Sequence, residues 1–562
     1  MRPALSLAGR ISCIFKRLFH GYTDLMSERI TAPPSPRREL SPQRQERRLA
    51  RARTLMESDP FEALDEVHAL LDAGATTAPV YALQCELLTG LGCGTFAALA
   101  AENGLAAGGD RLTFLRLLLK AHLTGFNRKP AAAVLDKLMA EGPLDKPTRE
   151  EAAFAAHELH RYDLAETLYG ELLAEDPNDP KAGINLAYAR HKTGRLDEAR
   201  ALYTHAVKVR PEATNGLRLL VDSRKQTQDD NDRALVIATR HRLVPGSEDY
   251  ATASYALGKV EEDLKDYDAA FAAFSSGAAI MRGKMPYSTE ASRHTFDTTK
   301  LWFDRPARSA TSMPDGPQPV FVLGMPRTGS TLIDRILSSH SQVRSMGELG
   351  CFKEAMKVIT GYGGGDGFHE HFYRQRGRDI DLDALGRFYT QAASPADGAK
   401  RYFIDKYPMN FMDLGLIAEA LPGARFIHTI RHPLDIVFGN FKQLFTLGFY
   451  HYSYDLKEAA EYYLLYRDLM AFWHDRFPGR ILDVVYEDHI NDPQGTAHTL
   501  LDHLGLDWDE RVLRFFENAA PVDTASLSQV RRPIYKTAVG HWQRYERHLG
   551  PAIDVLSGQV TL

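Results

Sequence analysis

A loop between an apolar stretch and a helical stretch is the first part of this sequence that could do chemistry. It runs Gly324-Met-Pro-Arg-Thr-Gly-Ser-Thr331 and directly follows the apolar residues 320–323. Residues 332–337 then carry an apolar face at helical spacing. Backbone N–H groups at a helix N-terminus point into such a loop, and the helix dipole favours an anion there. The pattern therefore predicts a phosphate site.

The loop is close to the nucleotide P-loop G-x-x-x-x-G-K-[ST], with one difference. Gly324, Gly329 and Thr331 fit this pattern, whereas Ser330 occupies the lysine position. Kinases and ATPases use that lysine, with magnesium, to stabilise the phosphate being transferred. Here the nearby charge is Arg327, inside the loop. The loop is thus suited to hold a phosphate but lacks the usual equipment for γ-phosphoryl transfer.

Further polar residues follow other apolar stretches of strand length. Lys406 comes soon after residues 402–404, Arg431 follows 424–430, and Tyr486 follows 481–485, with helical stretches between them. Strands that alternate with helices imply a parallel sheet with helices on both faces.

These motifs, in this order, resemble the sulfotransferases that use 3′-phosphoadenosine 5′-phosphosulfate (PAPS) as the sulfuryl donor. The resemblance covers about residues 319–549 and points to the tyrosylprotein sulfotransferase branch and its bacterial tetratricopeptide relatives. It implies that the loop holds the 5′-phosphosulfate through the residues Arg327, Thr328, Gly329, Ser330 and Thr331.

The resemblance also implies roles for residues outside the loop. Arg431 is expected to bind the 3′-phosphate of PAPS, and Lys406 to contact the sulfate and the bridging oxygen. Tyr486 is expected near the adenosine, Ser526 at the reactive end of the donor, and His541 near a basic donor contact.

The expected general base is Glu348, which matches a glutamate of the family; a surface glutamate or a partner of a nearby arginine is the alternative. His340, in the turn before it, is expected to be structural. Gly439 departs from the family, which usually has a serine there to share the 3′-phosphate. The neighbouring Asn440 could compensate, and Gly439→Ser is expected to tighten donor binding.

Two other functions stay open at this point. A P-loop kinase or NTPase is disfavoured by Ser330, and a nucleotide-binding scaffold without sulfotransferase activity is favoured only by Gly439. The sequence does not fix the acceptor: the resemblance suggests peptide tyrosine, and a carbohydrate or small-molecule hydroxyl stays open. We find no metal-ligand spacing of His, Cys and Asp, and sulfuryl transfer of this kind needs no metal.

The sequence before the loop is helical and contains an internal repeat. Residues 163–177 and 197–211 align at an offset of 34, the tetratricopeptide period. Helices are therefore predicted over 182–192 and 196–209. Weaker copies of the same kind lie at 61–71, 131–139 and 268–274. Stacked helix pairs leave a concave surface suited to a protein or peptide acceptor, although a purely structural scaffold is the alternative.

The bulk composition limits the partners and the compartment. The chain has 562 residues, a net charge of −5 and four cysteines without a CxxC pair. No nucleic-acid partner and no disulfide framework are expected, and a reducing, cytoplasmic location fits best. No run of about 18 apolar residues predicts a membrane span.

The predicted fold is an α-helical tetratricopeptide-like solenoid followed by an α/β P-loop-like domain with a parallel sheet. The predicted divisions are a disordered basic extension over 1–47, the helical repeats over 48–312, a linker over 313–318 and the sulfotransferase domain over 319–562.

Overall fold

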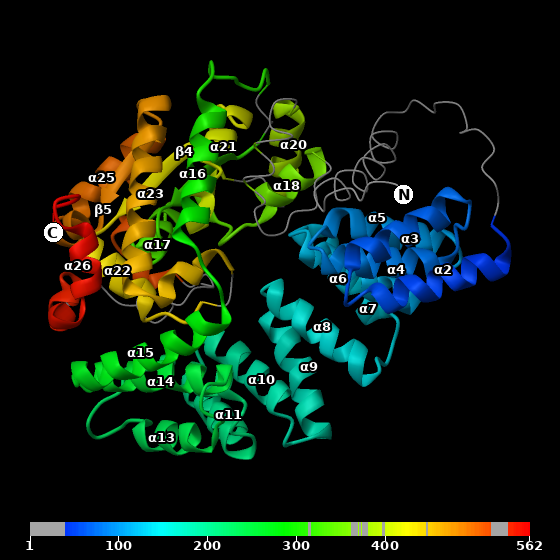
Figure 1. Cartoon of the computed structure of the whole chain (residues 1–562), viewed down its shortest axis with the longest axis horizontal. Coiled ribbons are helices and arrows are strands. Elements are labelled where there is room, and N and C mark those ends of the chain that lie inside the picture. Colours follow the sequence, from blue (N-terminus) through cyan, green and yellow to red (C-terminus); the bar gives the residue numbers. More distant parts are fainter. Residues whose placement is uncertain are drawn as a thin grey trace.

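The structure is a computed structural model that describes residues 40–312, 316–360, 369, 373, 380–395, 400–445, 448–518 and 538–561. It consists of an arc of helices followed by an α/β part, and both lie side by side in Figure 1.

The arc is built from the helices between residues 42 and 284, which pack mainly against near neighbours in the chain, and one more helix, Thr289–Phe303, packs instead against helix Leu456–Arg476 of the α/β part (Figure 1). In chain order, the helices up to residue 303 are α2 (Pro42–Leu55), α3 (Pro60–Asp72), α4 (Ala78–Gly90), α5 (Gly94–Ala106), α6 (Arg111–Thr124), α7 (Arg128–Ala140), α8 (Lys146–Glu158), α9 (Tyr162–Glu175), α10 (Pro180–Lys192), α11 (Leu196–Val209), α12 (Thr214–Asp222), α13 (Arg233–Arg242), α14 (Glu248–Asp263), α15 (Tyr267–Lys284) and α16 (Thr289–Phe303).

The 34-residue repeat has a packing cause. Ala165 and Tyr169 of α9, and Ala199 and Tyr203 of α11, are all buried at equivalent positions. A small residue lets the neighbouring helix approach, and the aromatic ring one turn later fills the space beside it. The two helices predicted over 182–192 and 196–209 are confirmed as α10 and α11.

The predicted disorder up to residue 47 is wrong at its C-terminal end, because α2 begins at Pro42. Ser41 precedes the helix and Pro42 occupies its first turn, where the missing N–H costs nothing. Arg48 and Arg51 pair with carboxylates of α3, and Ala52 is buried. The basic composition of this segment therefore serves contact with α3. Residues 1–39 lie outside the described residues.

The α/β part is a five-stranded, fully parallel sheet in the order β2-β3-β1-β4-β5. The strands are β1 (Gln318–Leu323), β2 (Val343–Ser345), β3 (Tyr402–Asp405), β4 (Arg425–Ile430) and β5 (Ile481–Val485). The predicted parallel sheet is confirmed, and β1 begins at the last residue of the predicted linker. β2 was not predicted, because three residues that include an arginine carry no apolar pattern.

Helices cover both faces of this sheet, so the central strand β1 is buried on both sides. Val320 and Val322 pack into one core, and Phe321 and Leu323 into the other. The covering elements are α17 (Ser330–Ser338), α18 (Cys351–Thr360), α20 (Leu382–Ala393), η2 (Pro408–Phe411), α21 (Leu414–Ala420), α22 (Pro433–Phe441), η3 (Gly448–Tyr454), α23 (Leu456–Arg476), α24 (Tyr486–Asn491), α25 (Pro493–Leu504), η4 (Glu510–Val512), η5 (Phe515–Glu517), η7 (His541–His548) and α26 (Gly550–Leu556).

The arc contacts the α/β part at both of its ends. At the N-terminal end, Glu354 of α18 accepts a hydrogen bond of 2.9 Å from the Thr95 N–H of α5, and Lys357 donates to the Gly92 carbonyl at 2.7 Å. At the C-terminal end, Arg282 of α15 pairs with Glu458 of α23 at 2.7 Å. Figure 1 shows α8 to α11 between these two contact regions.

In the described part of the chain, we find no helix with the length and apolar character needed to cross a lipid bilayer.

Candidate active site

The glycine loop connects β1 to α17 and has an unusual backbone. Gly324, Arg327 and Gly329 have positive φ angles of 143°, 72° and 97°. The two glycines are also places of close approach: a Cβ at Gly324 would lie 2.6 Å from the Thr429 carbonyl oxygen, and one at Gly329 would lie 2.6 Å from the Tyr486 ring. Arg327 is a non-glycine residue in the left-handed region, a conformation that persists only where the surroundings enforce it.

Hydrogen bonds with neighbouring elements hold the loop in this conformation. The Thr328 hydroxyl donates to the Met325 carbonyl at 2.8 Å and lies 2.6 Å from the Thr429 hydroxyl of β4. Asn440 of α22 donates its amide to the Pro326 carbonyl at 2.9 Å. Thr328, like the first two residues of α17, is buried. The loop is therefore fixed from two sides.

Asn440 cannot be the free phosphate ligand that its position beside Gly439 suggests. Its side chain is fully buried and also donates to the Ile436 carbonyl at 2.8 Å. Its amide oxygen accepts from the Tyr452 hydroxyl at 3.3 Å. All the amide groups of Asn440 thus serve the packing of α22 and the loop.

Lys406 and Glu348 come together beside this loop. Lys406 follows β3, which pairs with β1, and the Gly324 N–H donates to the Pro408 carbonyl at 3.2 Å. The ammonium of Lys406 forms an ion pair with the Glu348 carboxylate. The lysine side chain is 3% exposed and the glutamate side chain 42% exposed. The pair therefore has a buried cation and a carboxylate that solvent and an acceptor can reach.

The segment that carries Glu348 is held against the end of β3. The Met346 N–H donates to the Ile404 carbonyl at 3.0 Å, and the Lys406 N–H to the Gly347 carbonyl at 2.9 Å. The buried Asp405 accepts from the Tyr389 hydroxyl at 2.9 Å and from the Leu349 N–H. Burial raises the pKa of Asp405 to about 7.

Arg431 lies at the end of β4, on the other side of the loop. Its guanidinium donates to the Arg327 carbonyl at 3.3 Å, pairs with Asp435 at 3.2 Å and lies over the Tyr486 ring, 4.6 Å from its centre. The guanidinium also donates to the Ala538 carbonyl. The structure thus brings Arg431 and Tyr486 to the same loop.

Asp435 is a residue of this region that the sequence analysis missed. Besides pairing with Arg431, its carboxylate accepts from the Gly540 N–H at 3.0 Å and from the Trp542 N–H at 2.9 Å. It therefore ties the C-terminal segment to α22. The signal was its place one helical turn after Arg431 within Arg-His-Pro-Leu-Asp435.

Of the two C-terminal site candidates, Ser526 and His541, the structure describes only His541. Ser526 lies outside the described residues. The His541 imidazole lies 2.8 Å from the carboxylate of Glu262, a residue of the repeat helix α14, and 3.5 Å from the Lys442 ammonium. Burial lowers the pKa of His541, and Glu262 opposes this shift.

The histidines outside the loop have structural contacts. His340, as expected for a structural residue, is buried, and its Nε2 lies 3.0 Å from the Asp507 carbonyl. His428, His474 and Asp483 bring three potential metal-ligand atoms within 4.8 Å of one another.

That group is already hydrogen-bonded. Asp483 Oδ1 lies 2.8 Å from His428 Nδ1 and 2.9 Å from His474 Nε2. The other nitrogen of His428 bonds to Tyr466, whose hydroxyl also accepts from the Met325 N–H of the loop. The group therefore forms a support behind the loop.

Comparison with known proteins defines the class. Residues 319–510 match the sulfotransferase family, and residues 156–220 match the tetratricopeptide repeat. The chain thus carries a sulfotransferase-family domain that follows tetratricopeptide repeats, as the resemblance implied.

Among its relatives, an uncharacterized protein of Aquifex aeolicus (strain VF5) is 32% identical over 316 residues, which cover 54% of this chain and 41% of the relative. Protein-tyrosine sulfotransferase 2 of Gallus gallus is 22% identical over 242 residues, which cover 40% of this chain and 62% of the relative. The chain therefore spans less than two thirds of the length of either relative. The sulfotransferase domain of the Synechococcus PCC 7002 olefin synthase is 20% identical, with a TM-score of 0.30, over 42% of this chain and 91% of that domain.

Proposed function

We propose that this protein transfers a sulfuryl group from PAPS to an acceptor hydroxyl. The observation that carries the proposal is the Lys406–Glu348 pair beside a phosphate loop that has Ser330 in place of the P-loop lysine. A buried lysine and an accessible carboxylate in contact supply a cation for a leaving group and a base for an attacking hydroxyl.

The residues present suit a donor with two phosphate ends. The loop and the start of α17 offer backbone N–H groups to the 5′-phosphosulfate, beside Arg327. Arg431, supported by Tyr486, is suited to the 3′-phosphate. Its Nε is buried and has no hydrogen-bond partner among the described residues, so a further acceptor there would satisfy a donor that is costly to leave unpaired.

PAPS supplies a sulfuryl group attached to a phosphate oxygen. Glu348 accepts the proton of the acceptor hydroxyl as that oxygen bonds to sulfur. Lys406 and Arg327 stabilise the negative charge that grows on the phosphate oxygen as its bond to sulfur breaks. Ser526 keeps its predicted role at the reactive end, and His541 its role near the donor. The residues named in this scheme include no metal ligand.

For the acceptor, we propose a protein or peptide hydroxyl, with tyrosine as the leading case. The support is the name of the Gallus gallus relative, the exposure of Glu348 and the repeat arc that contacts α18 close to Glu348. The cytoplasm is the proposed location, and the buried thiols of Cys85, Cys93 and Cys351 agree with a reducing compartment.

The test is incubation of the purified full chain with sulfur-labelled PAPS and a cell lysate, followed by identification of the labelled product. Label in a protein band, mapped to tyrosine by hydrolysis, would support the whole proposal. Label in a carbohydrate or a small molecule would support the reaction and contradict the acceptor. Parallel incubation with ATP and magnesium tests the kinase alternative, and ATP turnover without label transfer would contradict the proposed function.

A further inference from the structure

Glu262 of the repeat helix α14 contacts three side chains of the α/β part. Both carboxylate oxygens accept from the Lys442 ammonium at 2.9 Å, and one of them also accepts from the Tyr545 hydroxyl at 2.9 Å. The same oxygen lies 2.8 Å from the His541 imidazole. The Glu262 side chain is 11% exposed. Groups from two separate segments of the α/β part thus converge on one carboxylate of the repeat region.

These two segments are the ones that surround Arg431. Lys442 directly follows α22, the helix that begins just after Arg431 and packs its Gly439 against Arg327. His541 and Tyr545 belong to η7, and backbone groups just before η7 and at its start, those of residues 538, 540 and 542, contact Arg431 and Asp435. Glu262 therefore holds the ends of both segments.

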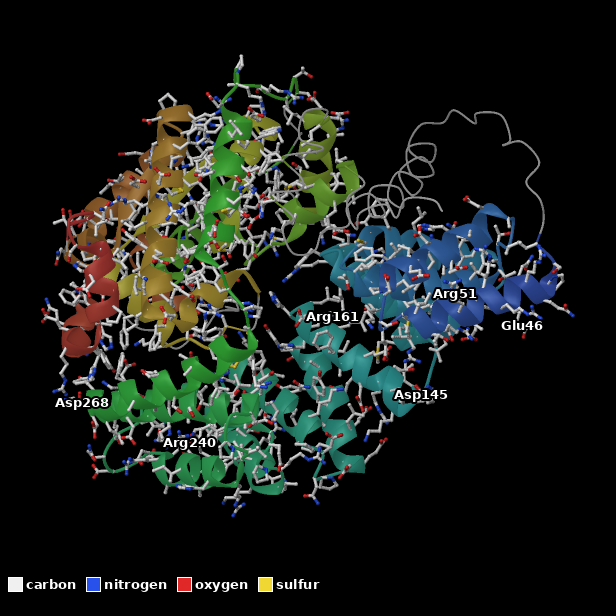
Figure 2. All side chains as sticks on the ribbon, in the orientation of Figure 1. Glu46, Arg51, Asp145, Arg161, Arg240 and Asp268 are labelled. Atoms are coloured by element: carbon white, nitrogen blue, oxygen red, sulfur yellow. The ribbon has the colours of Figure 1, made fainter. Side chains whose placement is uncertain are left out.

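The packing around Glu262 extends the same support. The Tyr545 ring meets the Tyr267 ring edge-on at 5.4 Å, and His548 stacks on Phe271 at 4.3 Å. Asp268, labelled in Figure 2 at the start of α15, pairs with His548 at 2.8 Å and also with Arg547. The whole of η7 therefore lies on the hairpin formed by α14 and α15.

The charges make Glu262 the centre of this contact. Burial by itself would raise the pKa of Glu262, but the neighbouring Lys442 and His541 hold it well below its usual range. Burial lowers the pKa of Lys442, which Glu262 opposes. Loss of the carboxylate would leave a largely buried ammonium without its counter-charge, so the two segments would have to rearrange.

We infer that the α14–α15 hairpin is a structural part of the donor site and that Glu262 is its positioning residue. Glu262 fixes Lys442 and His541, and with them the ends of α22 and η7, in the arrangement that Arg431 needs. This inference rests on the proposed function.

The test is calorimetry of the full chain with 3′-phosphoadenosine 5′-phosphate (PAP), the desulfated donor. Glu262→Gln is expected to raise the Kd of PAP about tenfold, and the KM of PAPS similarly, with kcat at saturating donor within about twofold. The direction in which the Kd of PAP changes is decisive, because removing a negative charge near an anion site would by itself tighten PAP binding. A weaker Kd therefore reports lost positioning.

Glu458→Gln is the matched control. It removes the pair with Arg282, which spans the same interface at 2.7 Å. Among the described residues, the hydrogen bonds and ion pairs of Glu458 are with Arg282 and Asp455 and not with α22 or η7. This variant is therefore expected to lower the melting temperature while the Kd of PAP stays within twofold. Tyr545→Phe removes one hydrogen bond to Glu262 without a change of charge and is expected to raise the Kd about threefold.

An equal or lower Kd in folded Glu262→Gln would overturn the inference, and so would an equally weakened Glu458→Gln. If Glu262→Gln does not fold, Tyr545→Phe decides, and an unchanged Kd in that variant overturns the inference. Failure of the wild-type chain to bind PAP would instead contradict the proposed function itself.

Discussion

Gly439 offers a quantitative test of how closely α22 packs against the loop. A Cβ at this position would lie 3.2 Å from the Cβ of Arg327 and 3.5 Å from its Cγ. Carbon atoms attract one another best at about 3.5–4.0 Å, so the new methyl group would be too close by roughly 0.3–0.8 Å. Either α22 or Arg327 has to move.

The structure indicates that Arg327 is the group that moves. Its φ of 72° depends on the packing around the loop, whereas Gly439 is inside a buried helix. Overpacking costs about 1–3 kcal/mol, and replacing a helical glycine by alanine returns at most about 1 kcal/mol. We therefore expect Gly439→Ala to lower the stability by roughly 1 kcal/mol and to raise the Kd of PAP about three- to tenfold.

Gly170→Ala is the matched control, because Gly170 lies inside helix α9 and a Cβ there would meet nothing within 4 Å. It is expected to stabilise the protein by about 0.5–1 kcal/mol and to leave the Kd unchanged. Calorimetry with PAP and thermal unfolding of both variants give the comparison.

Gly439→Ser separates the methyl group from the hydroxyl. From the sequence, serine was expected to tighten donor binding; the close contact with Arg327 now predicts weaker binding, as for alanine. If Gly439→Ser binds PAP more tightly than the wild type, the hydroxyl has gained a phosphate contact and the packing argument is refuted. An unchanged Kd in Gly439→Ala would refute it equally, because Arg327 would then have moved without any effect on PAP binding.

Three further predictions concern single residues of the site. Glu348→Gln is expected to lower kcat by about 10²–10⁴ with little effect on the Kd of PAP, measured by steady-state kinetics and calorimetry; a near wild-type kcat would remove its role as base. Arg431→Ala is expected to weaken PAP binding by about 1.5–3 kcal/mol, and an unchanged Kd would contradict its assignment to the 3′-phosphate. The pKa of Asp405 is raised to about 7 in the folded state, so between about pH 4 and 7 the folded protein holds a proton that the unfolded chain has lost. Wild-type stability is therefore expected to fall as the pH rises through this range, by at most about 1.4 kcal/mol per pH unit. Asp405→Asn is expected to remove this fall. The test is thermal unfolding of the wild type and of Asp405→Asn across that pH range, and stabilities that change with pH in the same way in both proteins would contradict the prediction.

The parts of the fold that the sequence predicts are those with local signals. The apolar runs of β1, β3, β4 and β5 and the glycine loop are legible because each is defined by neighbouring residues. β2 has no such run, and its place depends on pairing with β3. The basic composition of α2 favours disorder when the sequence is considered locally, because the carboxylates that pair with its arginines lie on α3.

The candidate site divides in the same way. Each motif around Lys406, Arg431 and Tyr486 is local, so the sequence suggests it. The contact of Lys406 with Glu348 depends on the β2–β3 pairing that brings their segments together. The contact of His541 with Glu262 depends on the docking of the repeats, and the sequence offers no signal for a partner on a different structural unit.

The position of η7 on the α14–α15 hairpin also has a consequence for biosynthesis. About 260 residues separate the end of α15 from η7, so at roughly 5–20 residues per second the ribosome needs about 13–50 s to make them. During that time Tyr267 and Phe271 lack their partners on η7, Tyr545 and His548. The repeat region therefore leaves the ribosome with an uncovered aromatic face, and its last hairpin reaches full stability only after η7 has also been made and has left the ribosome.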